Sequence, residues 1–221
     1  GDRRLNIDAG QGNVALQGNI GQTTPLSGLN VTASNTNFGG NVRTNNGNIN
    51  ISNALVLTND AIFSTAGGNI FFGGAIDNNN INPRNLTLDS GSGSITFNGS
   101  IGASSKLGNI LIQNAGNVTG NSTINAQQLT AANTQQVKLS GDVAAGKVDI
   151  KAQGDIAVKN VTTNGGEILF NSGNVFTAGN LNTSGNTGGN ITVKAITSIT
   201  TGQINSSGIV GNAGNVFLDP I

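Results

Sequence analysis

One short motif recurs along the whole chain: a glycine, a small or polar residue, an isoleucine or valine, any residue, and then an apolar residue. The first copy is Gly12-Asn13-Val14-Ala15-Leu16 and the last is Gly214-Asn215-Val216-Phe217-Leu218. Such recurrence predicts repeated structural units that pack against their neighbours. The nine copies have their first Ile or Val at Val14, Ile49, Ile70, Ile95, Ile110, Val148, Ile168, Ile191 and Val216.

The spacing of the copies indicates the length of one repeat. Most gaps between successive copies are similar in length, and the two long gaps, which precede Ile49 and Val148, are close to twice as long. Leu129 divides the second of these long gaps into two equal parts. The resulting period of roughly 20 residues lies in the range of solenoid repeats.

The local pattern within each copy is that of a β-strand. Apolar residues alternate with other residues, which is a period of two and not the helical 3.6. The segments are short and are bounded by Gly, Asn, Ser and Thr, residues that favour turns. Short strands, turn clusters and a period of about 20 residues together predict an all-β parallel β-helix with one coil per repeat. We expect residues 1–221 to form a single solenoid of about ten coils.

Stacking of such coils predicts two columns of side chains. The nine Ile and Val residues named above would form one apolar column inside. A position beside them holds asparagine in six copies, and amide side chains in the same position of successive coils can form a hydrogen-bonded ladder. The alternative is that these asparagines are only solvated turn residues. The candidates for the ladder are Asn13, Asn48, Asn69, Asn109, Asn190 and Asn215.

The composition excludes several classes of function. The chain has no Cys or His, so a zinc finger, a thiol nucleophile, a disulfide framework and a histidine acid–base pair are impossible. Ten basic residues balance ten acidic ones, and without a basic stripe we expect no nucleic-acid partner. We also expect no cofactor and no metal site.

Parallel β-helices include polysaccharide-processing enzymes, so the acidic residues are candidate catalytic groups. Glycoside hydrolysis needs two carboxylates about 5–10 Å apart, and neighbouring coils place side chains about 5 Å apart. The C-terminal half also has lysines interleaved with its carboxylates, which favours a solvated face with cross-coil ion pairs. We therefore predict no enzymatic activity. The carboxylates in question are Asp142, Asp149, Asp155 and Glu167.

Three features together resemble a known family. They are the Gly-Asn-Ile-x-Ile repeats, the block Leu-Thr-Leu-Asp-Ser-Gly-Ser-Gly-Ser-Ile-Thr-Phe at 86–97, and the ending Gly-Asn-Val-Phe-Leu-Asp-Pro at 214–220. Along essentially the whole chain, the sequence resembles filamentous-haemagglutinin-like exoproteins of Gram-negative bacteria, including cyanobacterial relatives. The resemblance implies a right-handed parallel β-helix that is exported by two-partner secretion through an outer-membrane pore. Because no segment matches the secretion domain of that family, we expect this chain to be a segment or a processed subunit of a longer exoprotein.

The expected function is structural. We expect a stiff β-solenoid rod in a secreted bacterial surface fibre or adhesin, located outside the cell or on its surface. Partners implied by the resemblance are the outer-membrane secretion pore and a cell-surface or matrix ligand that the sequence does not identify. The alternative is a filament subunit that stacks end to end with other copies, because open coil edges are templates for pairing. A polysaccharide-processing enzyme is the further alternative.

Overall fold

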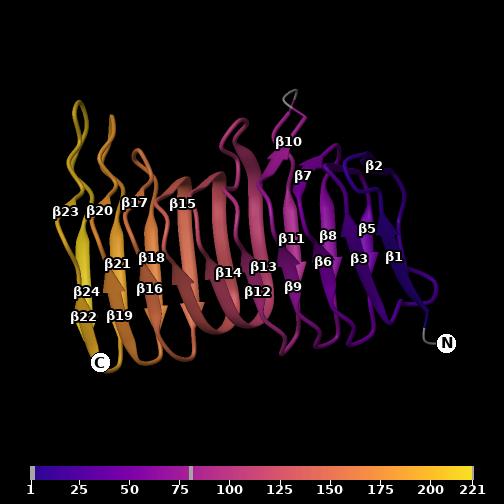
Figure 1. The fold of residues 1–221 in the computed structure, drawn as a ribbon. Helices are drawn as coiled ribbons and strands as arrows, with labels where there is room; N and C mark the ends of the chain where they lie inside the picture. Colours follow the sequence, from indigo (N-terminus) through magenta and orange to yellow (C-terminus); the bar gives the residue numbers. More distant parts are fainter. Residues whose placement is uncertain (1–2, 80–81, 221) are drawn as a thin grey trace.

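The computed structural model describes residues 3–79 and 82–220. In these residues all regular secondary structure is β-strand, and the strands pair in parallel with strands of the neighbouring turns (Figure 1). The turns stack in about ten coils, with the two ends of the chain at opposite ends of the stack. The predicted parallel β-helix is therefore confirmed. Within the described ranges no helix is long and apolar enough to cross a membrane.

Each coil has three faces, which we number in the order in which the chain passes through them. Three long strands continue around corners and contribute to more than one face: β13 (Leu107–Gly120), β14 (Ile124–Leu139) and β15 (Val143–Ala152). The other strands of face 1 are β1 (Arg4–Asp8), β3 (Gly28–Thr32), β6 (Ile49–Ile51), β9 (Ile70–Phe72), β12 (Ile95–Phe97), β16 (Ile156–Val158), β19 (Val175–Ala178) and β22 (Ser198–Thr200).

The remaining strands belong to the other two faces. Those of face 2 are β2 (Asn13–Leu16), β4 (Asn35–Phe38), β7 (Ala54–Leu57), β10 (Ile76–Asn78), β17 (Val161–Thr162), β20 (Leu181–Asn182) and β23 (Ile204–Asn205). Those of face 3 are β5 (Asn41–Arg43), β8 (Ala61–Ser64), β11 (Leu86–Asp89), β18 (Ile168–Ser172), β21 (Ile191–Ala195) and β24 (Val216–Pro220).

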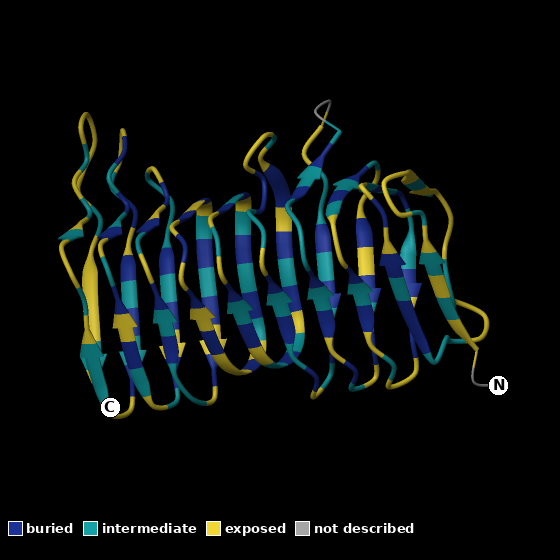
Figure 2. Cartoon of the chain, in the orientation of Figure 1, coloured by how far each residue is buried: buried dark blue, intermediate teal, exposed yellow. Residues whose placement is uncertain are grey.

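Inward-pointing side chains stack in register along every face. One inward position can be followed through the coils of face 1 from Leu5 to Ile199, and its successive members lie one coil apart in the sequence. Their spacing confirms the period that the motif copies predict. The interior that these positions enclose is buried along most of the stack, whereas the strands at its two ends are more exposed (Figure 2).

The prediction of one apolar column through the nine motif copies is wrong. The copies divide among all three faces, because the motif marks the passage from a corner into a strand and every coil has several such corners. The short gap between Ile95 and Ile110, for example, takes the chain from face 1 to face 3 within one coil. Val14 lies on face 2; Ile49, Ile70 and Ile95 stack on face 1; Ile110, Val148, Ile168, Ile191 and Val216 lie on face 3, with Leu129 between the first two.

The glycine that opens the motif has a steric role at these corners. A side chain on Gly166 would overlap the carbonyl oxygen of Gly146 one coil below, and a side chain on Gly189 would overlap that of Gly166. The backbones of successive coils therefore approach too closely for a Cβ atom. The recurrence of glycine in the sequence reflects this contact between coils.

Four phenylalanine rings form a chain of contacts inside the N-terminal half. The ring centroids of Phe38 and Phe63 lie 4.9 Å apart, and those of Phe63 and Phe72 lie 5.3 Å apart in an edge-to-face arrangement. The rings of Phe72 and Phe97 are parallel, with centroids 5.6 Å apart. Such aromatic pairs contribute about 0.5–1.5 kcal/mol beyond the burial of their area. This cluster links all three faces of the N-terminal coils.

Thr36 is a polar residue in the apolar column of face 2, between Val14 and Leu55. It is 1% exposed, and its Oγ1 has no hydrogen-bond partner. Since a buried hydroxyl without a partner costs about 1–3 kcal/mol, we expect Thr36→Val to raise the free energy of unfolding by about 1 kcal/mol. Urea denaturation followed by circular dichroism measures the change.

Thr44→Val is the matched control for this prediction. Thr44 is also buried, but its hydroxyl donates to the carbonyl oxygen of Gly47 at 2.6 Å. Removing that hydroxyl leaves an acceptor without its donor, so this variant should lose stability. A loss in both variants would show that the Thr36 hydroxyl has a stabilising partner after all.

Candidate functional site

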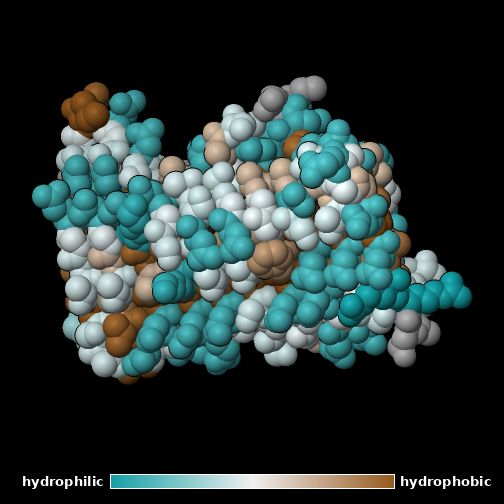
Figure 3. Space-filling model, viewed as in Figure 1, coloured by the Kyte–Doolittle hydropathy of each residue, from teal (hydrophilic) through white to brown (hydrophobic). Residues whose placement is uncertain are grey.

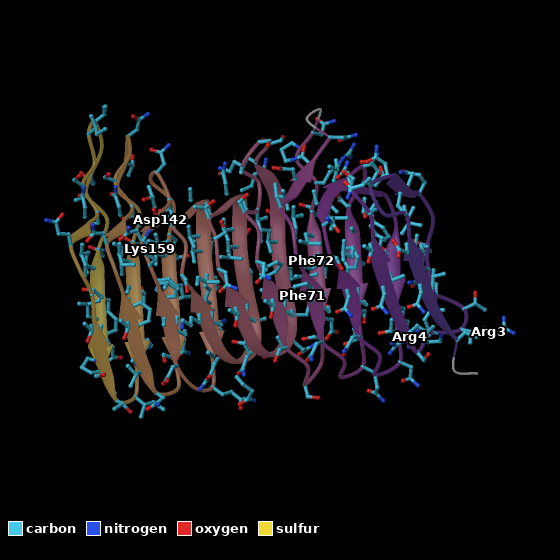
Figure 4. All side chains as sticks on the ribbon, in the orientation of Figure 1. Arg3, Arg4, Phe71, Phe72, Asp142 and Lys159 are labelled. Carbon is cyan, nitrogen blue, oxygen red and sulfur yellow. The ribbon has the colours of Figure 1, made fainter. Side chains whose placement is uncertain are left out.

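Two of the carboxylates considered as catalytic candidates, Asp142 and Asp155, each contact a different residue of the next coil. Asp142 Oδ1 accepts a hydrogen bond from Asn160 Nδ2 at 3.0 Å and lies 3.3 Å from Lys159 Nζ (Figure 4). Asp155 Oδ1 accepts from Asn174 Nδ2 at 2.7 Å. These two side chains thus connect one coil to the next.

Glu167 and Asp149 lie on the outside of face 3. Glu167 Oε2 is 2.8 Å from Lys147 Nζ, and the hydrogen bond and charge of Glu167 raise the pKa of Lys147 above its ordinary value. Asp149 follows Lys147 on β15, and its Oδ1 is shielded from solvent without a hydrogen bond. Within residues 3–79 and 82–220, no three acidic side chains form a group that could hold a metal ion. The contact of Glu167 with Lys147 is therefore an ion pair between two coils.

We expect the Lys147–Glu167 pair to contribute little to stability. The two side chains are 42% and 41% exposed, and a double-mutant cycle with Lys147→Ala and Glu167→Ala should therefore give a coupling free energy of about 0.2–1 kcal/mol. Salt should reduce it. Because folding raises the pKa of Lys147, the contribution is complete below the unfolded value of 10.5 and disappears as the pH rises through the folded pKa. A coupling that persists well above that pH would contradict the assignment.

The prediction of one amide ladder through the motif asparagines is wrong: the side-chain carbonyls of Asn48, Asn69 and Asn190 instead accept hydrogen bonds from backbone N–H groups of the next coil. Asn48 Oδ1 accepts from the N–H of Asn69 at 2.9 Å, and Asn69 Oδ1 accepts from the N–H of Ser94 at 2.8 Å. Asn190 Oδ1 accepts in the same way from Asn215 at 2.8 Å. Each amide thereby satisfies a backbone donor at a corner of the next coil.

The six asparagines of the predicted ladder do not share one column, because the motif copies that contain them lie on three different faces. Asn48 and Asn69 precede strands of face 1, and Asn13 begins β2 on face 2, in register with Asn35. On face 3 lie Asn109, whose N–H donates to Asn85 Oδ1 at 2.7 Å, and the pair Asn190 and Asn215. The single ladder is therefore replaced by several short ones.

Amide–amide bonds occur at a position of face 1 that the motif does not mark. Asn50 Nδ2 donates to Asn30 Oδ1 at 2.9 Å, and Asn30 Nδ2 donates to Asn6 Oδ1 at 2.8 Å. In the next coil Phe71 takes this position, in register with Asn50. Phe71 lies on the strand next to the buried Phe72 (Figure 4).

The last described coil exposes apolar side chains that are buried in every interior coil. Val216 and Leu218 are 45% and 42% exposed, whereas Ile191 and Val193, their partners one coil earlier, are fully buried. Phe217, between them, is also exposed, and Lys194 Nζ lies 5.9 Å from the centre of its ring. At this end of the described stack, both the apolar interior and the edge of β24 are exposed.

The loops between faces 2 and 3 project further from the stack with each coil toward its C-terminal end (Figure 1). The last two pair through their backbones: the N–H of Ile209 donates to Gly185 O at 2.9 Å, and the N–H of Val210 donates to Asn186 O at 3.1 Å. Ile209 and Val210 are 79% and 85% exposed, and apolar atoms cover the tip of the last loop (Figure 3). The three loops span 163–167, 183–190 and 206–215.

A surface depression of about 200 Å³ crosses four coils at the corner between faces 3 and 1. Amide side chains, Lys151 and the exposed Ile196 line it, and no carboxylate is among its lining residues. These groups can bind a ligand by hydrogen bonds and apolar contact, but they include no pair of acid and base. The amides are those of Asn133, Gln153 and Asn171.

The fold places this chain in the class of parallel β-helices. No protein-family model, curated protein or solved structure matches it. The function proposed below is therefore argued from the fold and from the sequence repeats.

Sequence reasoning did not identify the surfaces that are most distinctive in the structure. The motif copy at 214–218 has the same pattern as the interior copies, so its sequence does not show that its apolar residues are exposed. One signal for the projecting loops was present. The gaps that precede the last two copies, at Ile191 and Val216, are longer than the gap that precedes Ile168, and the added residues lie in the loops.

Proposed function

We propose that this chain is a rigid structural segment of a secreted bacterial surface fibre or adhesin, in which its β-helix acts as a stiff rod. The role is mechanical and not catalytic. The observation that carries the proposal is the continuous register: backbone ladders on three faces and one apolar interior continue through all described coils. At about 4.8 Å per coil, ten coils make a rod of about 50 Å.

The physical basis of the stiffness is that every coil is hydrogen-bonded to its neighbours on three sides. Bending the rod or separating two coils would break backbone bonds and expose the apolar interior at once. Side-chain bonds such as those of Asn30 and Asp142 add further links between coils. These links replace the disulfides that the chain lacks.

The extracellular location and the secretion route rest on the resemblance of the repeats to filamentous-haemagglutinin-like exoproteins. In this proposal the outer-membrane secretion pore is the export partner, and the chain is a segment or processed subunit of a longer exoprotein. Antibodies raised against residues 1–221 test the location. We expect them to label intact cells that produce the protein; labelling only after permeabilisation would reject the proposal.

Force spectroscopy tests the mechanical role. The chain is pulled from its two ends between reference domains. We expect stepwise unravelling at high force, with about 70 Å of added length for each released coil of roughly 20 residues, since an extended residue spans about 3.3–3.6 Å. Smooth extension at low force would contradict a load-bearing rod. Assays with acidic polysaccharides should show no turnover, and turnover that is lost in Glu167→Gln would favour an enzyme.

A further inference from the structure

The depression at the corner between faces 3 and 1 lies where that corner changes its length. Strand β14 passes the corner with one residue more than β15, between the paired positions Ala131–Ile150 and Thr134–Ala152. Such an extra residue is a β-bulge, which bends the strand that carries it. Asn133, inside this bulge, lines one side of the depression. The side of the stack thus has a built step at this point.

Lys151 gives the depression a positive charge that no described carboxylate neutralises. The ammonium groups of Lys147, Lys159 and Lys194 each lie within 4.0 Å of a carboxylate oxygen. Lys151 forms no such pair with any residue that the structure describes, and its side chain is exposed. Its backbone is held in place, because the buried Thr134 donates its hydroxyl hydrogen to the carbonyl oxygen of Lys151 at 2.8 Å. A positioned cation without a partner favours an anionic ligand.

Amide side chains with unused hydrogen-bonding groups lie around this cation. Gln153 Oε1 accepts from Gln135 Nε2 at 2.9 Å, which leaves the amide nitrogen of Gln153 available. Asn133 Nδ2 donates to Asn114 Oδ1 at 3.3 Å, which leaves its carbonyl oxygen available. The side chain of Asn171 has no hydrogen bond to any described residue. Since a side-chain amide both donates and accepts, these groups match the hydroxyl groups of a sugar.

A second depression, on the outside of face 1, has similar groups but a different charge. Its volume is about 230 Å³, and Lys138 lines it together with the amides of Asn117 and Gln136. Its lining also includes Asp155, whereas the depression beside Lys151 has no carboxylate in its lining. The lysine and the carboxylate of the second depression balance each other, so an anionic ligand gains no net attraction there.

We propose that the depression beside Lys151 binds an acidic sugar, namely a uronate unit of a polysaccharide. The sugar carboxylate pairs with the Lys151 ammonium, and the sugar hydroxyls exchange hydrogen bonds with the amides of Gln153 and Asn171. Ile196, which is 57% exposed, packs against the C–H groups of the ring. The volume of about 200 Å³ is smaller than the roughly 300–1,000 Å³ of sites for drug-sized ligands, which suits a single sugar unit.

This inference deepens the proposed function, because it names a ligand class for the adhesin, and it rests on that function for its role at a cell surface. The two can fail separately. Binding is measured on the purified chain without force, so a lack of binding would leave the rod function standing. Smooth extension under force would reject the rod and leave the binding site standing.

Nuclear magnetic resonance of nitrogen-15-labelled residues 1–221 tests the site, with tetragalacturonate as the probe. We expect backbone amide shifts that saturate at millimolar probe concentrations and that cluster at 132–134, 151–153 and 171–173. Two matched probes define the ligand: a neutral tetrasaccharide of galactose, and tetraglutamate, which carries carboxylates on a peptide. Each should bind at least about tenfold more weakly, because one lacks the charge and the other the hydroxyl groups. Equal binding of either probe, or no shifts at these residues, would overturn the proposal.

Two variants of the depression test the assignment of its residues. Lys151→Gln removes the cation, and Asn171→Asp places a carboxylate in register beside it. Each should lower the affinity for tetragalacturonate by about tenfold. Lys138→Gln is the matched control, since it removes an exposed lysine from the second depression, and it should leave the affinity unchanged.

Thermal melting of each variant, followed by circular dichroism, separates loss of binding from loss of the fold. All three substituted side chains are exposed, so the melting temperatures should equal that of the unchanged chain. Affinity that persists in both Lys151→Gln and Asn171→Asp would overturn the proposal. An equal loss in Lys138→Gln would also overturn it, because binding would then not depend on the depression beside Lys151.

Discussion

Phe72→Ala is expected to lower the free energy of unfolding by about 3–5 kcal/mol, the range for removal of a buried phenylalanine. Phe72 is 1% exposed, and its ring touches two others, the edge-to-face ring of Phe63 and the parallel ring of Phe97. Truncation leaves a cavity between coils and removes both aromatic contacts. Urea denaturation followed by circular dichroism measures the loss.

The neighbouring residue is the matched control for this change. Phe71 lies on the same strand, but its side chain points to the outside of face 1, where it is half-buried between Asn50 and Thr96. Phe71→Ala removes the same atoms without opening the interior, and we expect a loss of about 1 kcal/mol or less. Equal losses in the two variants would contradict the inward and outward assignment of this strand.

Gly166→Ala is expected to cost about 3 kcal/mol or more, at the upper end of the range for overpacking. The added methyl group would overlap the carbonyl oxygen of Gly146, and this backbone atom cannot rotate away as a side chain would. The coils must separate locally, which weakens the backbone ladder beside β18. A lower urea midpoint, together with faster hydrogen exchange in β15 and β18, would report the separation.

Gly18→Ala is the control for this substitution. A Cβ atom on Gly18 meets no atom within 4 Å, so alanine fits there. Because alanine restricts the unfolded chain more than glycine does, we expect no loss and a gain of up to about 1 kcal/mol. If Gly166→Ala were equally harmless, close approach of the coils would not explain the glycine of the motif.

The copy at Gly166-Glu167-Ile168-Leu169-Phe170 illustrates how far the sequence alone leads. Its alternation predicts a strand with Ile168 and Phe170 inside and Leu169 outside, and the structure has this pattern in β18. The distance to the next copy predicts stacking on Ile191, which the register confirms. The same reasoning fails at Val14, because nothing in that copy shows that it lies on face 2.

The sequence by itself determined that this protein is a β-solenoid whose repeated unit is one coil. Alternation and corner glycines are local requirements of every coil, so they recur visibly along the chain. The tertiary structure alone decided which face each strand occupies, which donor each asparagine meets, and which apolar residues stay exposed. Those outcomes depend on corner lengths and on register between residues a whole coil apart. Val216 and Ile191 have the same sequence pattern, and Ile191 is buried in the described residues because the coil that contains Val216 stacks on it.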